Sequence, residues 1–585
     1  MKLTYQTDII LIIALVLAVL WFVNGIVDIV RNSPYTDFEL MYRAGEALND
    51  GRLPYDLSMI HATPTLGNEY RFPPFFASLL AFFTPYEFEK VALGWFLLNQ
   101  VFYFGTLALL YKILGIKFCS VEFYILAIIF LVFQPTLDSL AGGQLDCFFL
   151  LLLSLTWWAL ESRRDKFAGA VNALATIIKI YPGIIILFFL LRRRWKALKF
   201  YIITLIALIV LSIILAGWNA NYKFFFDVLP AIKGGTAYIE NQSLYGFLSR
   251  LYINDAFQIS NSIAVEVIDR LTSSHIKLLS YLVDILIFVA TIFFAYRTSQ
   301  DRIVFANLIT MTLLILPVAW IHYETILLFP ITVLFCQQCT KKHDFTGWAG
   351  LFIIYALIAF GNQDIVRSSS LEALRSYKVI GVFLLWLFGI KGMIENSNAS
   401  YNLSYVKIVA VALIFISLIS IPPIMLRPFR VEDGQYFILH FHTAEKITIN
   451  DDYSHLDLFN LNNDPRPVLF EHPPSQITYK LKIPEGSLLT FGIGLDSKTW
   501  GADNGDGVLF EIYVQDGGVQ ERLFSKYIDP KNKIEDRKRH DEVVDLSRYG
   551  KKEVSLSFVT TPGPNNNTDY DWAGWGEPKL ISNTK

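Results

Sequence analysis

The fold of this chain is decided first by the stretch Ile9–Val30, IILIIALVLAVLWFVNGIVDIV. It is long enough to cross a bilayer, which takes about 20 apolar residues. A cleavable signal has a shorter apolar core followed by a small-residue cleavage site, and this stretch has neither feature. Comparable apolar runs recur as far as residue 426, so the sequence predicts a polytopic α-helical membrane protein.

The composition supports a large surface that faces lipid. The chain has 585 residues, of which 54% are hydrophobic and 17% are charged, whereas soluble domains carry about a quarter charged residues. The charges are segregated: they collect in short loops and in the residues after 426. This asymmetry predicts a membrane part, 1–426, followed by a water-soluble part, 427–585.

The basic loops orient the predicted spans. Counting every apolar run, with the last at 406–426, gives about thirteen spans. The loops Arg163–Lys166, Arg192–Lys196 and Arg297–Arg302 then fall on one side, which the positive-inside rule makes cytoplasmic. We therefore expect a multi-pass protein of the cytoplasmic (inner) membrane, with a cytoplasmic N-terminus. The long polar segments, the soluble domain and any active site would lie outside.

Residues 427–585 change to the period of two that strands show, as in Tyr436–Phe441, YFILHF, and Val554–Val559, VSLSFV. Turn residues interrupt these runs at short intervals, which favours an all-β sandwich. The loop Asp503–Gly507, DNGDG, lacks the spacing of a calcium loop and is interpreted as a tight turn. Two tryptophans in Asp569–Pro578 either stack on sugar rings or lie in the core.

Asp37 and Lys179 are the first two candidate site residues. Asp37 follows the first span closely, where a carboxylate could act as a general base on a sugar hydroxyl. Thr36-x-x-Glu39 also matches a capping box, in which Asp37 is merely a first-turn acid. Lys179 comes at the outer end of a tight helix pair, and it either binds a lipid phosphate or snorkels to the interface.

Further candidates lie at outer helix ends. His322, Tyr323 and Glu324 form the densest polar cluster in the apolar part, although such residues also occur in aromatic belts. Gln144 follows two glycines at the start of an apolar run, and Asp146 is interpretable as a first-turn acid. Asn241 and Arg250 suit hydroxyl or phosphate recognition, but a solvated loop with a capped helix explains them equally well.

The chain has no Walker A sequence, no Rossmann glycine pattern and no HExxH motif. These absences argue against a nucleotide donor bound through such a fold, and nothing points to a nucleic-acid partner or a cofactor. No carboxylate cluster is visible on the external side, so no metal is required.

Several segments, taken in order, resemble glycosyltransferase family 87, within the type C glycosyltransferase superfamily. They are Asp37…Tyr42-Arg43-Ala44-Gly45, Phe72-Pro73-Pro74-Phe75, Gly143-Gln144-Leu145-Asp146, Ile178-Lys179-Ile180-Tyr181-Pro182, Asn241-Gln242-Ser243-Leu244 and Pro317-x-x-Trp320-x-His322-Tyr323. The resemblance implies a type C fold and a sugar donor on polyprenyl phosphate, with a mannose-like hexose favoured. It implies Asp37 as general base, and Lys179 and His322 near the donor phosphate. The soluble domain resembles sandwich modules appended to bacterial sugar-transfer proteins, some of them carbohydrate-binding.

The sequence thus favours an inverting glycosyltransferase that moves a sugar to a glycan or glycolipid acceptor on the external face. Asp37 would be catalytic, and Lys179, His322, Gln144, Asn241, Arg250 and Tyr323 would bind substrate. A transporter or flippase of lipid-linked sugars is the first alternative, although no internal repeat supports it. A non-catalytic glycan-binding scaffold is the second.

Overall fold

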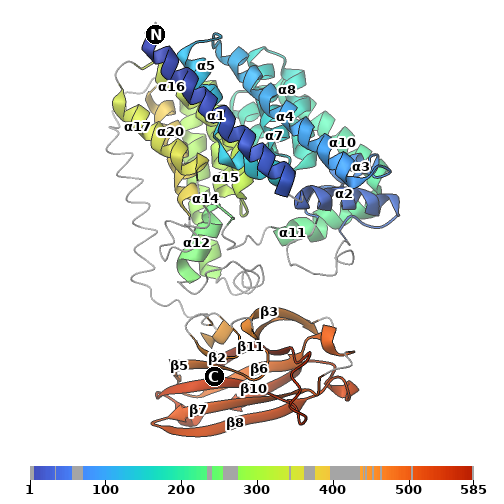
Figure 1. Ribbon diagram of the computed structural model, residues 1–585. Coiled ribbons are helices and arrows are strands. Elements are labelled where there is room, and N and C mark those ends of the chain that lie inside the picture. The colour runs from blue at the N-terminus through green and yellow to red at the C-terminus, as the bar shows by residue number, and fades with distance from the viewer. Residues whose placement is uncertain are drawn as a thin grey trace. The chain divides into compact units, whose positions relative to one another are not determined.

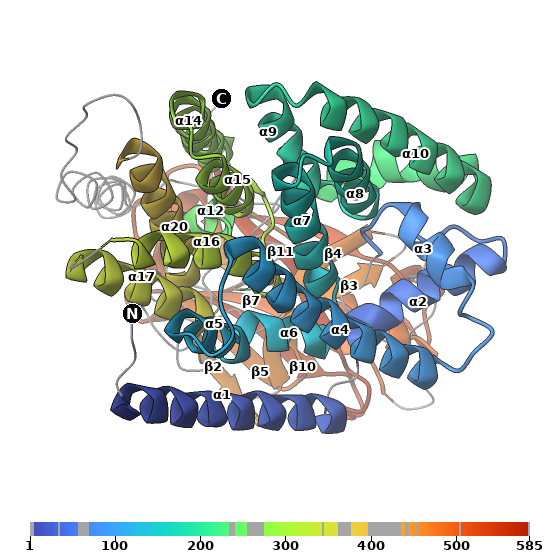
Figure 2. The ribbon, with the colours of Figure 1, turned by 90° about the horizontal axis from the view of Figure 1, so that it is seen from above.

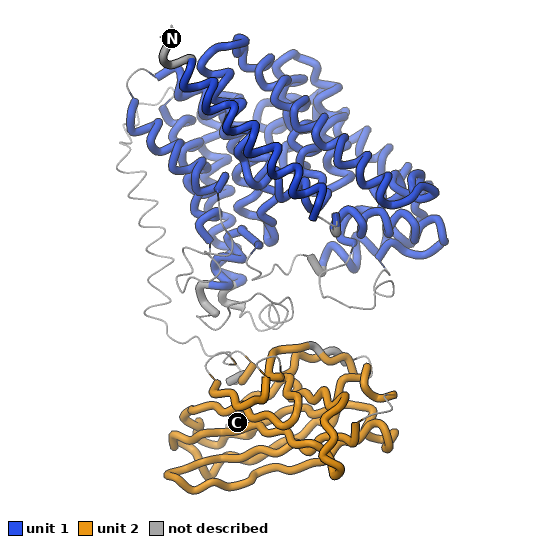
Figure 3. The backbone as a smooth tube through the Cα atoms, in the orientation of Figure 1, with its two compact units in different colours: residues 1–251, 275–421 blue, residues 252–274, 422–585 orange. Residues whose placement is uncertain are grey.

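The computed structural model describes residues 5–32, 35–55, 70–232, 240–253, 274–341, 344–360, 376–395, 435–438, 441, 444–450, 453–461, 464–501 and 505–582. The chain divides into two compact units, residues 1–251 with 275–421 and residues 252–274 with 422–585 (Figure 3). The first unit is helical and the second is built of strands (Figure 1). The predicted boundary between 426 and 427 lies outside the described residues.

The first unit contains helices at most of the predicted apolar runs. The described elements are α1 (Tyr5–Asn32), α2 (Thr36–Asn49), α3 (Pro74–Ala81), α4 (Phe88–Leu114), α5 (Val121–Leu131), α6 (Gln134–Gly142), α7 (Asp146–Glu161), α8 (Asp165–Ile178), η2 (Tyr181–Ile185), α9 (Ile186–Leu191), α10 (Trp195–Lys223), η3 (Phe224–Val228), α11 (Leu229–Ile232), α12 (Leu244–Ile253), α14 (Ser274–Arg297), α15 (Asp301–Ile315), η4 (Ile321–Leu327), α16 (Leu328–Cys339), α17 (Phe345–Ala359) and α20 (Tyr377–Glu395). The run predicted at 406–426 lies outside the described residues.

The predicted count of about thirteen spans is not confirmed. Among the described residues, five helices are long and apolar enough to cross a membrane: Ile9–Asn32, Phe88–Leu114, Trp195–Val228, Lys277–Arg297 and Tyr377–Glu395. The bent pair α5 and α6 gives a sixth if it is one span. Shorter apolar helices such as α7 are largely buried in the bundle, with α1 along one side (Figure 2). Hydropathy alone does not separate a buried core helix from one that faces lipid.

Ion pairs join the basic loops at one end of the bundle. Arg192 Nε lies 2.6 Å from Asp301 Oδ1, and the same guanidinium donates to the carbonyls of Ala295 and Thr298. Arg302, at the start of α15, forms an ion pair with Glu161 at the end of α7. The loops that follow α7, α9 and α14 therefore meet, as their predicted common side requires.

The second unit is a sandwich of two antiparallel sheets. One has the strand order β3 (Ser454–Leu461), β4 (Asp464–Glu471), β11 (Ala573–Ser582), β6 (Ser487–Leu495) and β9 (His540–Asp545), with β1 (Gln435–Tyr436) paired to β11; the other has the order β2 (Glu445–Thr448), β5 (Ser475–Lys482), β10 (Glu553–Pro562), β7 (Val508–Asp516) and β8 (Val519–Ile528). Alternate side chains of both sheets share one buried core. The predicted all-β domain is thus present.

Trp575 lies in this core rather than on the surface. Its side chain is fully buried, and its ring centroid lies 5.5, 5.0 and 5.2 Å from those of Phe491, Phe510 and Phe558. Its Nε1 donates a 2.7 Å hydrogen bond to Glu471 Oε2. Of the two alternatives for this tryptophan, core packing is the one observed.

The Asp503–Gly507 loop is described only from Gly505 onward. Gly505 has φ 95° and Gly507 has φ 83°, both in the region that favours glycine. No turn is assigned at residues 505–507, so the interpretation of this loop as a tight turn stays a prediction.

Asp571 makes the stability of the β unit depend on pH. Burial, followed by the neighbouring carboxylates of Asp506, Asp529 and Asp569, raises the pKa of Asp571 to about 8. An unfolded Asp titrates near about 3.9, so between these values the folded state holds a proton that the unfolded chain has lost. The stability that this proton contributes is complete below about pH 4 and is lost as the pH rises toward about 8.

We expect scanning calorimetry of the full-length protein to show a lower unfolding temperature for the β unit at pH 8.5 than at pH 5. Asp571→Asn should flatten this slope, because the amide carries no titrating proton. Asp541→Asn, at an exposed position, is the control and should leave the slope unchanged. An Asp571→Asn protein with the wild-type slope would contradict the assignment.

Candidate functional site

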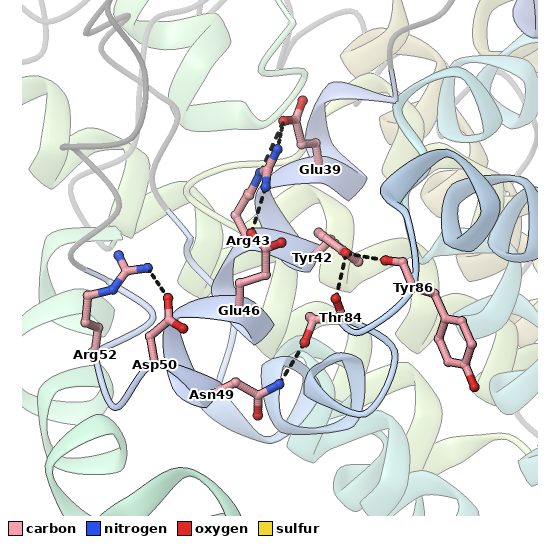
Figure 4. A network of polar contacts seen from close by, with 9 residues as sticks. All are labelled: Glu39, Tyr42, Arg43, Glu46, Asn49, Asp50, Arg52, Thr84 and Tyr86. Atoms are coloured by element: carbon pink, nitrogen blue, oxygen red, sulfur yellow. Dashed lines mark hydrogen bonds and ion pairs between the residues drawn. The ribbon is translucent and has the colours of Figure 1, made fainter.

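Helix α2 brings Asp37 to the site. The helix is fixed on α3 and the turn after it: the Tyr42 hydroxyl donates to the carbonyls of Thr84 and Tyr86, and Asn49 Nδ2 donates to Thr84 Oγ1 (Figure 4). A Cβ on Gly45 would lie 2.8 Å from the Ala81 nitrogen, so only glycine allows this close crossing. The first turn of α2, which contains Asp37, is therefore held in one place.

The alternative reading of Thr36-x-x-Glu39 as a capping box is wrong. The N-cap residue is Tyr35, with a left-handed φ of 49°, and it makes no side-chain capping hydrogen bond. Thr36 is already the first helical residue, whereas a capping box needs its threonine at the N-cap. Glu39 instead pairs with Arg43 along α2, as Figure 4 shows.

The turn between α6 and α7 lies against Asp37. Gln144 Nε2 donates a 2.7 Å hydrogen bond to Asp37 Oδ2. Trp95 Nε1 donates to the Gly143 carbonyl at 2.8 Å, and the Trp95 ring stacks on Phe38 at 5.5 Å between centroids. The two glycines that precede Gln144 thus let the turn approach α2 closely enough for this contact.

A prediction follows for Gly143. The φ of Gly143 is 66°, and a Cβ added there would lie 2.6 Å from Phe38 Cβ. Gly115 has the same φ of 66°, but a Cβ added there would have no neighbouring atom within 4 Å. Gly115→Ala should lower the free energy of unfolding by about 1–2 kcal/mol, the cost of a left-handed alanine. Gly143→Ala should lower it further, because Phe38 must also move. Equal shifts of the unfolding temperature in the two variants would contradict this close packing.

Asp146 and His322 form a buried dyad. Asp146 begins α7 and is 0% exposed, and its Oδ2 lies 2.6 Å from His322 Nδ1. The same oxygen accepts a 3.1 Å hydrogen bond from Ser139 Oγ. A carboxylate on one ring nitrogen fixes the orientation and tautomer of the imidazole. Nε2 has no hydrogen-bond partner among the described residues and is available to a substrate.

Sequence reasoning did not place Asp146 in the site. It was interpreted as a first-turn acid, which it is, since it begins α7. The available signal was an acidic residue at the start of an apolar run, because an ionisable group at membrane depth is a functional candidate by default.

Lys179 lies in an aromatic box. Its Nζ is 3.6 Å from the centroid of the Tyr323 ring, with Phe72, Tyr181 and Phe149 at 5.2, 5.5 and 5.9 Å. The rings of Tyr181 and Tyr323 stack at 5.8 Å. The buried Nζ has no hydrogen-bond partner within the part of the chain that the structure describes. A cation held by rings rather than by a carboxylate retains its hydrogen-bond donors for an anion.

Asn241 contacts the backbone that leads to His322, and Arg250 contacts Asn241. The Asn241 side chain donates to the Pro317 carbonyl at 3.0 Å and accepts from the Ala319 amide at 2.8 Å. Arg250 donates to the Asn241 carbonyl at 3.0 Å. Asn241 is 0% exposed, so these contacts make it a support for this segment.

The structure joins the other candidates in one row. Asp37 accepts a hydrogen bond from Gln144. Asp146, two residues after Gln144, is hydrogen-bonded to His322, and the ring of Tyr323, the residue after His322, lies over the ammonium of Lys179. Asp146 and Lys179 lie at the ends of α7 and α8, and the opposite ends of these helices, Glu161 and Asp165, pair with the basic loops. The row therefore lies at the end of the bundle away from those loops.

The row combines a carboxylate, a carboxylate-oriented imidazole and a buried ammonium. A carboxylate that accepts one hydrogen bond keeps lone pairs for a substrate hydroxyl. The cationic groups suit an anion such as a phosphate. Among the described residues, no group of three or more His, Cys, Asp or Glu side chains is placed to hold a metal ion.

Comparison with known proteins finds one family model and two curated relatives that match parts of the chain. Residues 70–317 match the model of glycosyltransferase family 87. An uncharacterized protein of Archaeoglobus fulgidus is 45% identical over 129 residues, 21% of this chain and 32% of its own. A polyprenol-phosphate-mannose-dependent alpha-(1-2)-phosphatidylinositol pentamannoside mannosyltransferase of Mycobacterium tuberculosis is 23% identical over 226 residues, 38% of this chain and 52% of its own. The chain thus spans about a third and about half of these curated relatives.

Solved structures with some likeness include two from Clostridium perfringens. The CBM51-2 and INT domains of ZmpB are 19% identical, with a TM-score of 0.17, over 22% of this chain and 25% of that one. CBM51 of GH95, solved in complex with methyl-galactose, is 18% identical, with a TM-score of 0.17, over 24% of this chain and 87% of that one. Scores this low carry no argument about this protein.

Proposed function

We propose that this chain, whose residues 70–317 match glycosyltransferase family 87, is an inverting glycosyltransferase. It moves a sugar, with a mannose-like hexose favoured, from a polyprenyl-phosphate donor to a glycan or glycolipid acceptor. The observation that carries the proposal is the row of contacts from Asp37–Gln144 through Asp146–His322 to Tyr323–Lys179. The name of the mycobacterial relative supports the choice of donor.

The row provides the groups that the reaction needs. Asp37 takes the proton of an acceptor hydroxyl, whose oxygen then attacks the anomeric carbon of the donor. The bond between that carbon and the phosphate oxygen breaks with its electron pair on the phosphate. Polyprenyl phosphate is a good leaving group, so no general acid is required. Attack from the opposite face inverts the anomeric centre.

The cations stabilise the charge that develops on the leaving phosphate. Lys179 presents an ammonium whose donors are not used by a described residue, and His322 presents Nε2 from a ring that Asp146 orients. Both groups are in place before the reaction, which is the condition for strong electrostatic stabilisation. Gln144 holds Asp37, while Asn241 and Arg250 support the segment of His322 and Tyr323.

The proposed site opens on the external face of the cytoplasmic membrane. The basic loops meet at the opposite end of the bundle from the row of site residues, and such loops face the cytoplasm. We propose the same external side for the C-terminal β unit, where it would hold the acceptor glycan.

A reconstituted transfer assay tests this function. The full-length protein in liposomes is incubated with radiolabelled polyprenyl-phosphate mannose and a lipid-linked oligosaccharide extract. We expect labelled glycan and free polyprenyl phosphate, with the anomeric configuration of the product, read by NMR, opposite to that of the donor. A retained configuration would overturn the inverting mechanism. Movement of intact donor between leaflets without transfer would favour a flippase.

A further inference from the structure

A buried ion pair lies behind the segment that carries His322 and Tyr323. Glu324 follows these residues in η4, and its Oε2 lies 3.0 Å from Lys378 Nζ in α20, with both side chains 3% exposed. The same Nζ donates to the Ile358 carbonyl near the end of α17. Three elements that are distant in the sequence therefore meet at one buried ammonium.

Stability alone does not account for this pair. Desolvating two charges costs about as much as their attraction contributes, so buried pairs are often replaceable by apolar residues without loss. The pair instead fixes where the Glu324 carboxylate lies. Among the described residues, Lys378 makes the only hydrogen bond to the Glu324 carboxylate, whose Oε1 has no partner. Lys378 therefore fixes the position of the Glu324 carboxylate in η4.

A second contact ties the same stretch of chain to the start of α20. Arg250 donates to Ser376 Oγ at 2.7 Å and, through its other terminal nitrogen, to the Asn241 carbonyl at 3.0 Å. Asn241 in turn accepts from the Ala319 amide and forms an isolated β-bridge with Trp320. Residues just before His322 are thus linked to Ser376, and the residue just after Tyr323 is linked to Lys378.

We propose that residues 376–378, at the start of α20, form a clamp that positions the segment 317–324 and so aligns His322 and Tyr323 with Asp146 and Lys179. Glu324 and Lys378 are positioning residues, and both lie beyond the residues 70–317 that match the family. The effect of the clamp on transfer rests on the proposed function. Its effect on the backbone of 317–327 does not, so the two ideas can fail separately.

The test combines hydrogen exchange with kinetics on the full-length protein. We compare Lys378→Met, Glu324→Gln and the double variant Glu324→Gln/Lys378→Met. In Lys378→Met, amides of residues 318–327 should exchange at least tenfold faster than in wild type. The matched control is Lys391→Met, another lysine of α20 that pairs with a glutamate, Glu395; it should leave that exchange unchanged.

The double variant separates positioning from stability. It removes both buried charges, so its unfolding temperature should return toward wild type, while exchange in 318–327 stays fast. With radiolabelled polyprenyl-phosphate mannose as the probe, kcat should remain at least tenfold below the wild-type value, and KM for the donor should change by a smaller factor. Lys378→Arg keeps the charge and the hydrogen-bond donors, so it should recover most of the slow amide exchange and most of the wild-type kcat.

Wild-type exchange and kcat in the double variant would overturn the proposal, because the pair would then matter only as balanced buried charge. If Lys378→Met does not fold, the double variant and Lys378→Arg still decide the matter. An absence of transfer by the wild-type protein would refute the proposed function but leave the exchange result to judge the clamp.

Discussion

Asp37→Asn is expected to lower kcat for sugar transfer by about 10²–10⁴-fold, the usual contribution of general base catalysis. Asparagine has the same shape, and its Oδ1 can still accept the hydrogen bond from Gln144 Nε2 that Asp37 Oδ2 accepts at 2.7 Å. The variant therefore retains the contact between α2 and the α6–α7 turn and loses only the ability to take a proton. KM for the donor should change little.

The matched control for this prediction is Asp50→Asn. Asp50 is the C-cap residue of the same helix and pairs on the surface with Arg52 at 2.7 Å, as Figure 4 shows. It should keep wild-type turnover. The measurement is the initial rate of label transfer from polyprenyl-phosphate mannose. Full transfer by Asp37→Asn would show that another group takes the proton.

Lys179→Met is expected to lower kcat by about 10²–10³-fold, the range found when one preorganised charge-stabilising donor is removed. Methionine fills the aromatic box formed by Phe72, Phe149, Tyr181 and Tyr323, so the packing around it remains. The charge that faces the leaving phosphate is lost. Because the negative charge on the leaving phosphate grows in the transition state, kcat should fall more than the affinity for the donor.

Lys196→Met, at an exposed position in the first turn of α10, is the control for the loss of one positive charge. Binding of polyprenyl phosphate, measured by native mass spectrometry, should weaken in Lys179→Met and remain unchanged in the control. A Lys179→Met protein that binds and turns over as wild type does would mean that this lysine only packs against its rings.

Local sequence patterns predicted the elements well. The apolar run Ile9–Val30 became part of α1, Tyr5–Asn32, because helix formation follows contiguous apolar and helix-forming residues. Alternation in Val554–Val559 likewise became part of β10. The number of spans was not predictable in the same way, since α7 owes its apolar composition to burial among other helices.

Site residues were predictable as individuals but not in their roles. Asp37, Lys179 and His322 stood out because lipid penalises polar side chains, so those that persist near an apolar run draw attention. Asn241 and Arg250 stood out equally, yet Asn241 contacts Pro317 and Ala319, and Arg250 contacts Asn241 and Ser376. Type and position in the sequence did not predict which of these side chains contact the backbone of a distant segment.

By itself, the sequence determined a membrane bundle followed by a β-sandwich, with basic loops at one end and its polar candidates at the other. These properties depend on residues within a few positions of one another. Only the tertiary structure decided that Asp146 orients His322 and that Gln144 holds Asp37, contacts that join residues 176 and 107 positions apart. It also decided that Lys378 holds Glu324, across 54 positions. Such contacts arise from the packing of helices, which no local pattern records, because many distant partners satisfy the same polar group equally well.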